Sequence, residues 1–100
     1  MRLEFDWDPA KAASNLRKHG VNFNIGMSVF RDPNAITIFD DEHSDNEDRW
    51  VTIGAGADGM LLLVIHTSTN FGDEVVRVRI ISARRPTIRE ARQYRTGPLQ

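Results

Sequence analysis

The sequence of 100 residues contains no cysteine, only two lysines and no long apolar run. Without cysteine the chain can form no disulfide bond, iron–sulfur cluster or thiolate zinc site, and it is compatible with a reducing compartment. The longest apolar stretch, Met60–Ile65, is far too short to cross a bilayer. Residues 1–16 carry acids and lack the apolar segment of a signal peptide. We therefore expect one cytoplasmic domain over residues 1–100, with no membrane contact.

Motifs for metals and for phosphate loops are also missing. The three histidines are 24 and 23 residues apart, so the spacing of a zinc site is absent. The acidic segment 40–48 lacks the glycine and the spacing of a calcium loop. Gly54 and Gly56 fall in a predicted hairpin turn rather than between a strand and a helix. We expect neither a metal nor a cofactor.

Arginine dominates the last quarter of the chain. Seven of the 13 basic residues lie there, all are arginines, and between residues 77 and 95 only Glu90 opposes them. A guanidinium group is a planar fork that binds phosphate oxygens two at a time. Residues 1–48 have five basic and ten acidic side chains, for a net charge of −5, whereas residues 49–100 have eight and four, for +4. This division favours nucleic acid or a charged partner, although pairing between the two halves would explain part of it.

Helix signals predict three helices, over residues 8–20, 22–31 and 87–95. Asp8-Pro9 is an N-cap followed by proline at the first helical position, and Gly20 is a C-terminal stop. In the second helix the apolar residues follow helical spacing up to the turn 32–34. Thr87 and Glu90 form a capping-box pattern, and Gly97-Pro98 is expected to end the last helix.

Four strands are predicted between the second and third helices, over residues 35–39, 49–54, 60–67 and 74–82. Short turns join them, so we expect an α+β fold with an antiparallel four-stranded sheet, two N-terminal helices, one C-terminal helix, and the helices on one face. In the last strand Val76, Val78 and Ile80 share one face, and Arg77 and Arg79 project from the other. Periodicity does not assign His66 to either face.

The polar residues could support RNA cleavage without a metal. This reaction needs a base for the 2′-hydroxyl, a cation for the phosphorane and an acid for the leaving oxygen. His43, Glu47 and His66 are candidates for proton transfer, and the candidate cations are Arg49, Arg79 and Arg84. Structural roles remain open: His66 is as well explained as a satisfied histidine at a strand end, His43 as part of a solvated loop and Tyr94 as a packing residue.

Short matching segments along almost the whole chain resemble the BrnT family of type II toxin–antitoxin ribonucleases. They are Phe5-Asp6-Trp7-Asp8-Pro9 with Lys11 and Asn15, Lys18-His19-Gly20-Val21 with Phe23, Val29-Phe30, Asp32-Pro33, His43-Ser44 with Glu47 and Arg49, Ile53-Gly54, His66-Thr67, Arg79-Ile80-Ile81-Ser82-Ala83-Arg84, and Glu90, Arg92 and Tyr94.

The resemblance implies a RelE-like fold and a metal-independent endoribonuclease that cuts RNA and arrests growth. It also implies a BrnA-type antitoxin, whose ribbon-helix-helix part binds operator DNA; the toxin would reach the operator only through it. The implied site residues are Glu47, Arg49, His66, Arg79 and Arg84 for catalysis, and Lys18, Arg77, Arg85 and Tyr94 for RNA binding. Two departures, Ser68-Thr69 and Ala91, remove cations that the family often carries.

Two functions therefore stand against each other: an endoribonuclease toxin, and a non-enzymatic basic module that binds an acidic or DNA-binding partner protein. Binding of generic RNA that weakens steeply with salt would distinguish the first from the second. Sequence-specific DNA binding is disfavoured because no recognition helix is evident and the arginines of the last helix suit backbone contacts.

Overall fold

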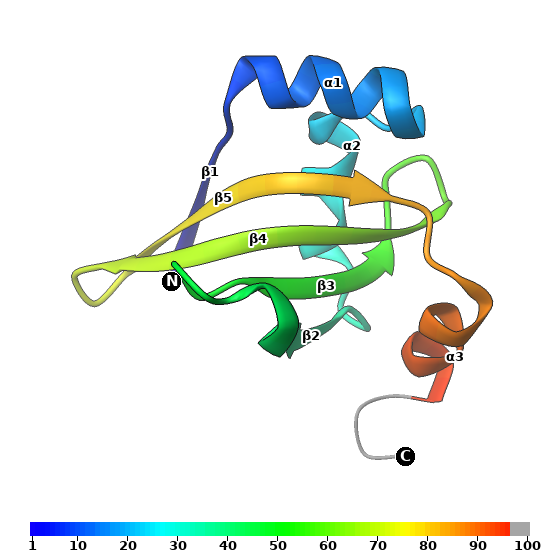
Figure 1. Ribbon diagram of the computed structural model, residues 1–100. Helices are drawn as coiled ribbons and strands as arrows, with labels where there is room; N and C mark the ends of the chain where they lie inside the picture. The colour runs from blue at the N-terminus through cyan, green and yellow to red at the C-terminus, as the bar shows by residue number, and fades with distance from the viewer. Residues whose placement is uncertain (97–100) are drawn as a thin grey trace.

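The computed structural model describes residues 1–96 and forms a five-stranded sheet with helices on both sides (Figure 1). The sheet order is β1-β5-β4-β3-β2, in which β1 runs parallel to β5 and the other neighbours are antiparallel. The elements are β1 (Arg2–Asp6), α1 (Pro9–His19), α2 (Phe23–Ser28), the 3₁₀ turn η1 (Val29–Arg31), β2 (Ile36–Phe39), the 3₁₀ turn η2 (Asp41–His43), β3 (Trp50–Ala55), β4 (Leu61–Phe71), β5 (Val75–Arg84) and α3 (Ile88–Thr96).

Strand β1 corrects the prediction of a four-stranded antiparallel sheet. Its alternation of charged and apolar residues places Leu3 opposite Val76 and Phe5 opposite Val78, on one face of β5. Three of its five residues are charged, so the segment lacks the β-branched composition that identifies a strand in sequence. The sheet is therefore mixed, and β1 extends it beyond the arginine-bearing strand β5.

Both predicted ends of the first helix and the predicted start of the second are confirmed, whereas the second α-helix ends at Ser28 and residues 29–31 form a 3₁₀ turn instead of its last turn. The Asp8 side chain accepts a hydrogen bond from the Ala10 amide, and Gly20 adopts a left-handed conformation with φ of 71°. Asn22 caps α2 by accepting from the Ile25 amide at 2.8 Å. The expected stop of the last helix at Gly97-Pro98 lies outside the described residues.

The helices cover both faces of the sheet, and not one face as the sequence predicts. Helices α1 and α2 cover the face whose buried cluster contains Phe23, Val64 and Ile80. Helix α3 packs on the other face, where Tyr94 contacts the cluster of Ile36, Ile53 and Leu63. The central strand β4 is apolar on both faces, so both need cover. We call the second face the α3 face.

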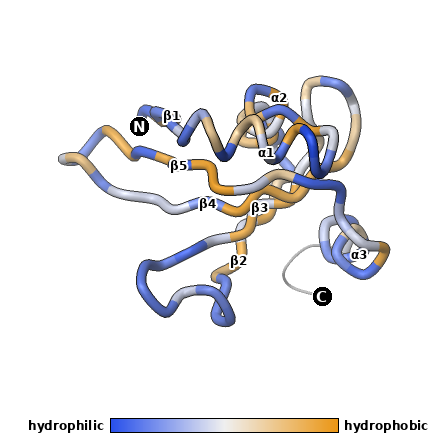
Figure 2. The backbone as a smooth tube through the Cα atoms, turned by 45° about the horizontal axis from the view of Figure 1, so that its top comes forward, coloured by the Kyte–Doolittle hydropathy of each residue, from blue (hydrophilic) through white to orange (hydrophobic). Residues whose placement is uncertain are grey.

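Hydropathy along the backbone separates the core strands from the connections (Figure 2). Strand β3 is hydrophobic, whereas the segment between β2 and β3 is a continuous hydrophilic stretch, and so is the link from β5 into α3. These two polar segments lie at different ends of the α3 face.

Asn15 joins the first helix to the sheet. Its side-chain amide donates to the carbonyls of Val21 and Ala83 at 2.9 and 2.8 Å, and its Oδ1 accepts from the Ala83 amide at 3.1 Å. Asn15 is buried, so these bonds replace water for backbone groups at the end of β5. Ala83 is the residue before Arg84, so these hydrogen bonds fix the backbone at the end of β5 that carries Arg84.

We predict that Asn15→Ala lowers the free energy of unfolding by about 3 kcal/mol, because three buried backbone groups lose their partner. Urea denaturation monitored by circular dichroism measures the change. Ser14→Ala, one residue earlier on the exposed side of α1, is the control and should change stability by less than about 0.5 kcal/mol. Equal stability of the two variants would contradict the role of Asn15.

Candidate functional site

A β-bulge places the arginines of β5 on one face. Arg79 and Arg84 are five residues apart, so a regular strand would turn them to opposite faces. The register between β4 and β5 shifts at Ile65/His66, and Arg79 then lies opposite Thr67 while Arg84 lies opposite Leu63. Thr67 and Leu63 share a face of β4, and both arginines therefore lie on the α3 face.

The same register builds a row of polar residues across the sheet. Asp6 pairs with Arg79, which pairs with Thr67. Trp50 pairs with His66, so Arg49, the residue before Trp50, lies beside Thr67 on the side opposite to Arg79. The Arg49 carbonyl accepts from the Asp40 amide at 2.9 Å. We call this set the polar row: Asp6, Arg79, Thr67, Arg49 and Asp40. It brings together residues from all parts of the sheet on the α3 face.

Carboxylates accompany the β5 arginines without enclosing them. Arg77 lies 3.4 Å from Glu4 and Arg79 lies 3.3 Å from Asp6, and the side chains of all four residues are well exposed. Exposed pairs of this kind contribute little to stability and are screened by salt. Oδ1 of Asp6 is buried and has no hydrogen-bond partner among the described residues, so the contact with Arg79 is an ion pair only. Phosphate oxygens can therefore compete for Arg77 and Arg79.

Arg84 is held more tightly. It forms a bidentate pair with Glu90, at 2.9 and 3.1 Å, and donates to the Arg85 carbonyl at 3.1 Å. The hydrogen bonds from Arg84 lower the pKa of Glu90 from 4.5 to about 2, against the opposing effect of burial. Glu90 also accepts from the Thr87 amide while its own amide donates to the Thr87 hydroxyl, which confirms the predicted capping box. Arg84 thus joins the end of β5 to the start of α3.

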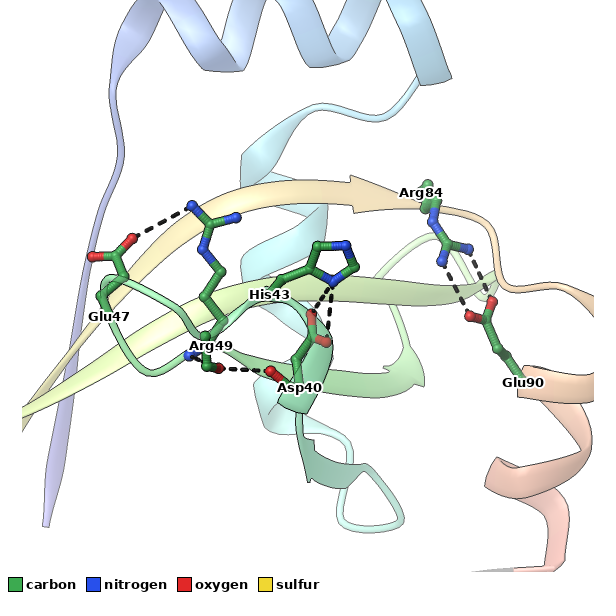
Figure 3. A network of polar contacts seen from close by, with 7 residues as sticks. Asp40, His43, Glu47, Arg49, Arg84 and Glu90 are labelled. Carbon is green, nitrogen blue, oxygen red and sulfur yellow. Dashed lines mark hydrogen bonds and ion pairs between the residues drawn. The ribbon is translucent and has the colours of Figure 1, made fainter.

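The segment 40–49 presents an Asp–His pair at the other end of the α3 face. The carboxylate of Asp40 lies 3.1 and 3.0 Å from Nδ1 of His43, which leaves Nε2 directed away from Asp40 (Figure 3). The Ser44 hydroxyl donates to the Asp40 carbonyl and accepts from the Arg49 amide, so it closes the loop internally. Asp40 was not a predicted site residue. The only sequence feature that indicates its contact with His43 is their separation of three residues, about one helical turn.

His43, Glu47 and Arg49 line one open pocket of about 200 Å³. Arg49 lies 3.6 Å from Glu47, and its buried Nε has no hydrogen-bond partner among the described residues (Figure 3). A carboxylate, an imidazole and a partly unsatisfied guanidinium group therefore share a small volume. Beside it lies a groove of about 410 Å³, whose lining includes the apolar residues Val51, Ile53 and Leu63 and also Gln93 of α3.

His66 lies away from this site. It is 2 % exposed, on the face covered by α1 and α2, and its Nε2 forms a 2.7 Å hydrogen bond with Thr52 Oγ1. Its ring packs edge-on against Phe30 at 5.0 Å between centroids. Burial lowers the pKa of His66 to about 4, so the imidazole is neutral at pH 7. The structure does not bring this predicted catalytic residue to the arginines, because it faces the core from a strand that is apolar on both sides.

Three predicted RNA contacts are also separate from the polar row. Lys18 is exposed on α1, and Arg85 lines a pocket with His19 on the side of the sheet that α1 and α2 cover. The Tyr94 hydroxyl donates to Asp32 at 2.6 Å, and this hydrogen bond raises the pKa of Tyr94. The pKa of Asp32 is lowered, mainly by a hydrogen bond from the Ala55 amide and further by the one from Tyr94. Tyr94 therefore anchors α3 to the sheet. Of the four predicted contacts, only Arg77 lies next to the polar row, because Tyr94 is on the same face but is held by Asp32.

In residues 1–96 no group of three or more histidine, cysteine, aspartate or glutamate side chains has the geometry to hold a metal ion. Within the same residues, none of the helices combines the length and the apolar character needed for a membrane span.

The fold is similar to that of a solved toxin. The crystal structure of the Brucella abortus ribonuclease toxin BrnT matches with a TM-score of 0.59 and 23% sequence identity, over 86% of this chain and 99% of that chain. The profile of the family described as ribonuclease toxin, BrnT, of type II toxin–antitoxin systems matches residues 7–90. The chain therefore belongs to the BrnT family of ribonuclease toxins, as its short motifs predicted. Among proteins of curated function, none matches this chain.

We predict that the Glu90 carboxyl titrates with a midpoint near pH 2 when followed by carbon NMR. Because the folded pKa lies below the unfolded value of 4.5, stability from the Arg84–Glu90 pair is complete above that value and is lost as pH falls through about 2. Arg84→Met should raise the midpoint toward 4.5, whereas Arg92→Met on the same helix should leave it in place. A midpoint that does not respond to Arg84→Met would show that another group holds the carboxylate ionised.

Proposed function

We propose that this BrnT-family chain is an endoribonuclease toxin that cuts RNA without a metal, by attack of the 2′-hydroxyl on the adjacent phosphate. The observation that carries the proposal is the polar row with the Asp40–His43 pair at its end, on an exposed face rich in arginine. Membership of a family of ribonuclease toxins supports it. The RelE-like character of the fold and action in the cytoplasm belong to the same proposal.

The residues of the small pocket divide the proton transfers between them. Glu47 takes the proton of the 2′-hydroxyl, the 2′ oxygen bonds to phosphorus, and the bond from phosphorus to the 5′ oxygen breaks. His43, held through Nδ1 by Asp40, gives the proton on Nε2 to the leaving 5′ oxygen. The products carry a 2′,3′-cyclic phosphate and a 5′-hydroxyl end. This assignment replaces His66 with His43 among the catalytic candidates.

Guanidinium groups of the polar row supply the electrostatic part. Arg49 and Arg79 flank Thr67 on neighbouring strands, which lie about 5 Å apart, so both reach a phosphate placed over Thr67. The negative charge that develops on its non-bridging oxygens is then met by fixed donors. Arg77 continues the same side of β5 and contacts the next phosphate, while the apolar groove beside Val51 receives a base. Arg84 positions α3 over that groove through Glu90.

The partner in this proposal is a protein antitoxin, as the family of type II systems implies. We propose that it is of the BrnA type, with a ribbon-helix-helix part that carries the complex to operator DNA. An antitoxin that covers the α3 face would use the same arginines as the RNA. A second function, a basic protein-binding module without enzymatic activity, is favoured by one observation: Arg77, Arg79 and Arg84 all have carboxylate partners in the free chain.

We predict that His43→Ala lowers kcat/KM for RNA cleavage by about 10² to 10⁴-fold, the usual contribution of a positioned acid or base. A fluorescent single-stranded RNA substrate measures the rate. His19→Ala, which removes a histidine on the other side of the sheet, is the control and should cut at the wild-type rate. Full activity of His43→Ala would exclude our assignment of the acid.

We predict that cleavage continues unchanged in EDTA, because no metal takes part in the proposed steps. The products should react as 2′,3′-cyclic phosphates in mass spectrometry. Complete loss of activity in EDTA would contradict the mechanism. Lack of RNA affinity even at low salt would instead favour the protein-binding module, since phosphate contacts strengthen as salt falls.

A further inference from the structure

The two edges of the sheet differ in how they are protected against pairing. Strand β1 carries charges at three of its five positions, Arg2, Glu4 and Asp6, a common defence of an exposed edge. Strand β2 at the opposite edge has the sequence Ile-Thr-Ile-Phe, without charge or proline. Ile38 and Phe39 are 36 % and 37 % exposed. An uncharged and exposed edge of this kind is a template for another strand.

The pairing of β2 with β3 determines which backbone groups of β2 point away from the sheet. The Asp40 amide donates to the Arg49 carbonyl, so Asp40 points its backbone groups toward β3. In an antiparallel pair this direction alternates, and Thr37 and Phe39 therefore point theirs away from the sheet. Among the described residues no other strand lies along this edge, since the sheet order ends at β2. Two amides and two carbonyls are thus available for an added strand.

The two ends of β2 carry opposite charge. Arg95 lines a depression with Asn34–Thr37 at the beginning of the strand. Asp41 and Glu42 begin two positions after its last residue, Phe39, and both are exposed. An antiparallel copy of the same strand would place its acidic end beside Arg95 and its basic end beside Glu42. The edge is therefore complementary to itself.

We propose that β2 pairs with β2 of a second copy of this chain, antiparallel and about a two-fold axis through Ile38. In this register the backbone of Thr37 forms two hydrogen bonds with the backbone of Phe39 in the other copy, and the backbone of Phe39 does the same with Thr37 of the other copy. The two Ile38 side chains then form the non-hydrogen-bonded pair at the axis and meet on the α3 face. The contact is isologous, so it closes with two copies.

This axis runs perpendicular to the sheet, because antiparallel neighbours in one sheet are related in that way. Both α3 faces therefore lie on the same side of one continuous sheet. The pairing does not depend on ribonuclease activity, since it uses only the edge and its flanking charges. Four residues from each strand make a small interface, so the dimer is reversible with a dissociation constant in the micromolar range.

Sedimentation equilibrium of the purified chain should show a monomer–dimer equilibrium in that range. The register gives a sharper test, because the chain contains no cysteine. Non-hydrogen-bonded pairs have Cα atoms about 4.5 Å apart, within disulfide reach. Ile38→Cys should therefore cross-link to a dimer under mild oxidation. Ile88→Cys is the control: Ile88 is 80 % exposed, so random collision would favour it, yet it should cross-link at least tenfold more slowly.

Charge reversal tests the ends of the strand without relying on the core. Arg95→Glu and Glu42→Arg each place like charges together in a homodimer, and each should raise the dissociation constant severalfold. An equal mixture of the two variants restores both contacts and should form heterodimers in preference to either homodimer. Fluorescence energy transfer between labelled variants measures this preference.

Two results would overturn the proposal. The first is a chain that remains monomeric at concentrations of hundreds of micromolar while the Ile38→Cys and Ile88→Cys variants cross-link equally slowly. The second is protection of the amides of β2 from hydrogen exchange only when a purified antitoxin is added, which would assign this edge to the antitoxin.

Discussion

The register between β4 and β5 decides where the charged residues of this protein lie. One extra residue in β5 at the bulge beside Ile65/His66 reverses the alternation, so that Arg84 joins Arg79 and Arg77 on one face. The same register aligns Arg49, Thr67 and Arg79 across three strands. A slip by one residue would send the arginines into the core formed by α1 and α2, where burial of unpaired charge is costly. The hydrophobic face of β5 therefore fixes the polar row as well as the core.

Placing several cations on one face of a small sheet costs stability through mutual repulsion, and the carboxylates on β1 reduce that cost. Glu4 and Asp6 lie opposite Arg77 and Arg79 in a parallel register, and Glu90 takes both nitrogens of Arg84. The exposed pairs are weak enough to be exchanged for phosphate, whereas the bidentate pair, which lowers the pKa of Glu90 to about 2, holds α3 in position. The acidic first half of the chain thus balances the basic second half within one fold. The charge division seen in sequence therefore reflects internal pairing as well as the arginine-bearing face that we propose to bind RNA.

Local signals in the sequence were sufficient for α1, for the hairpin of β3 and β4, and for the capping box of α3, because a cap or turn depends on residues close in the chain. They were insufficient for β1, which becomes a strand only when β5 offers a partner about 70 positions away. Periodicity also left open which face holds His66, since β4 is apolar on both sides. Asp40 and His43 could have been paired from their spacing, but the surrounding acids made the segment resemble a solvated loop. The face occupied by α3 depends on Tyr94 reaching Asp32, a contact between residues 62 positions apart.

Asp40 links the free edge of the sheet to the proposed chemistry. Its amide closes the last hydrogen bond of β2 onto Arg49, its carbonyl accepts from Ser44, and its carboxylate holds His43. Any strand that pairs with Thr37 and Phe39 restrains the backbone that carries Asp40, and so restrains the imidazole. If substrate orders His43 as proposed, linkage requires that it also favours strand pairing at the end of β2. In these two proposals, occupancy of the edge and the geometry of the polar row are linked through the contacts of Asp40, whatever chain occupies the edge.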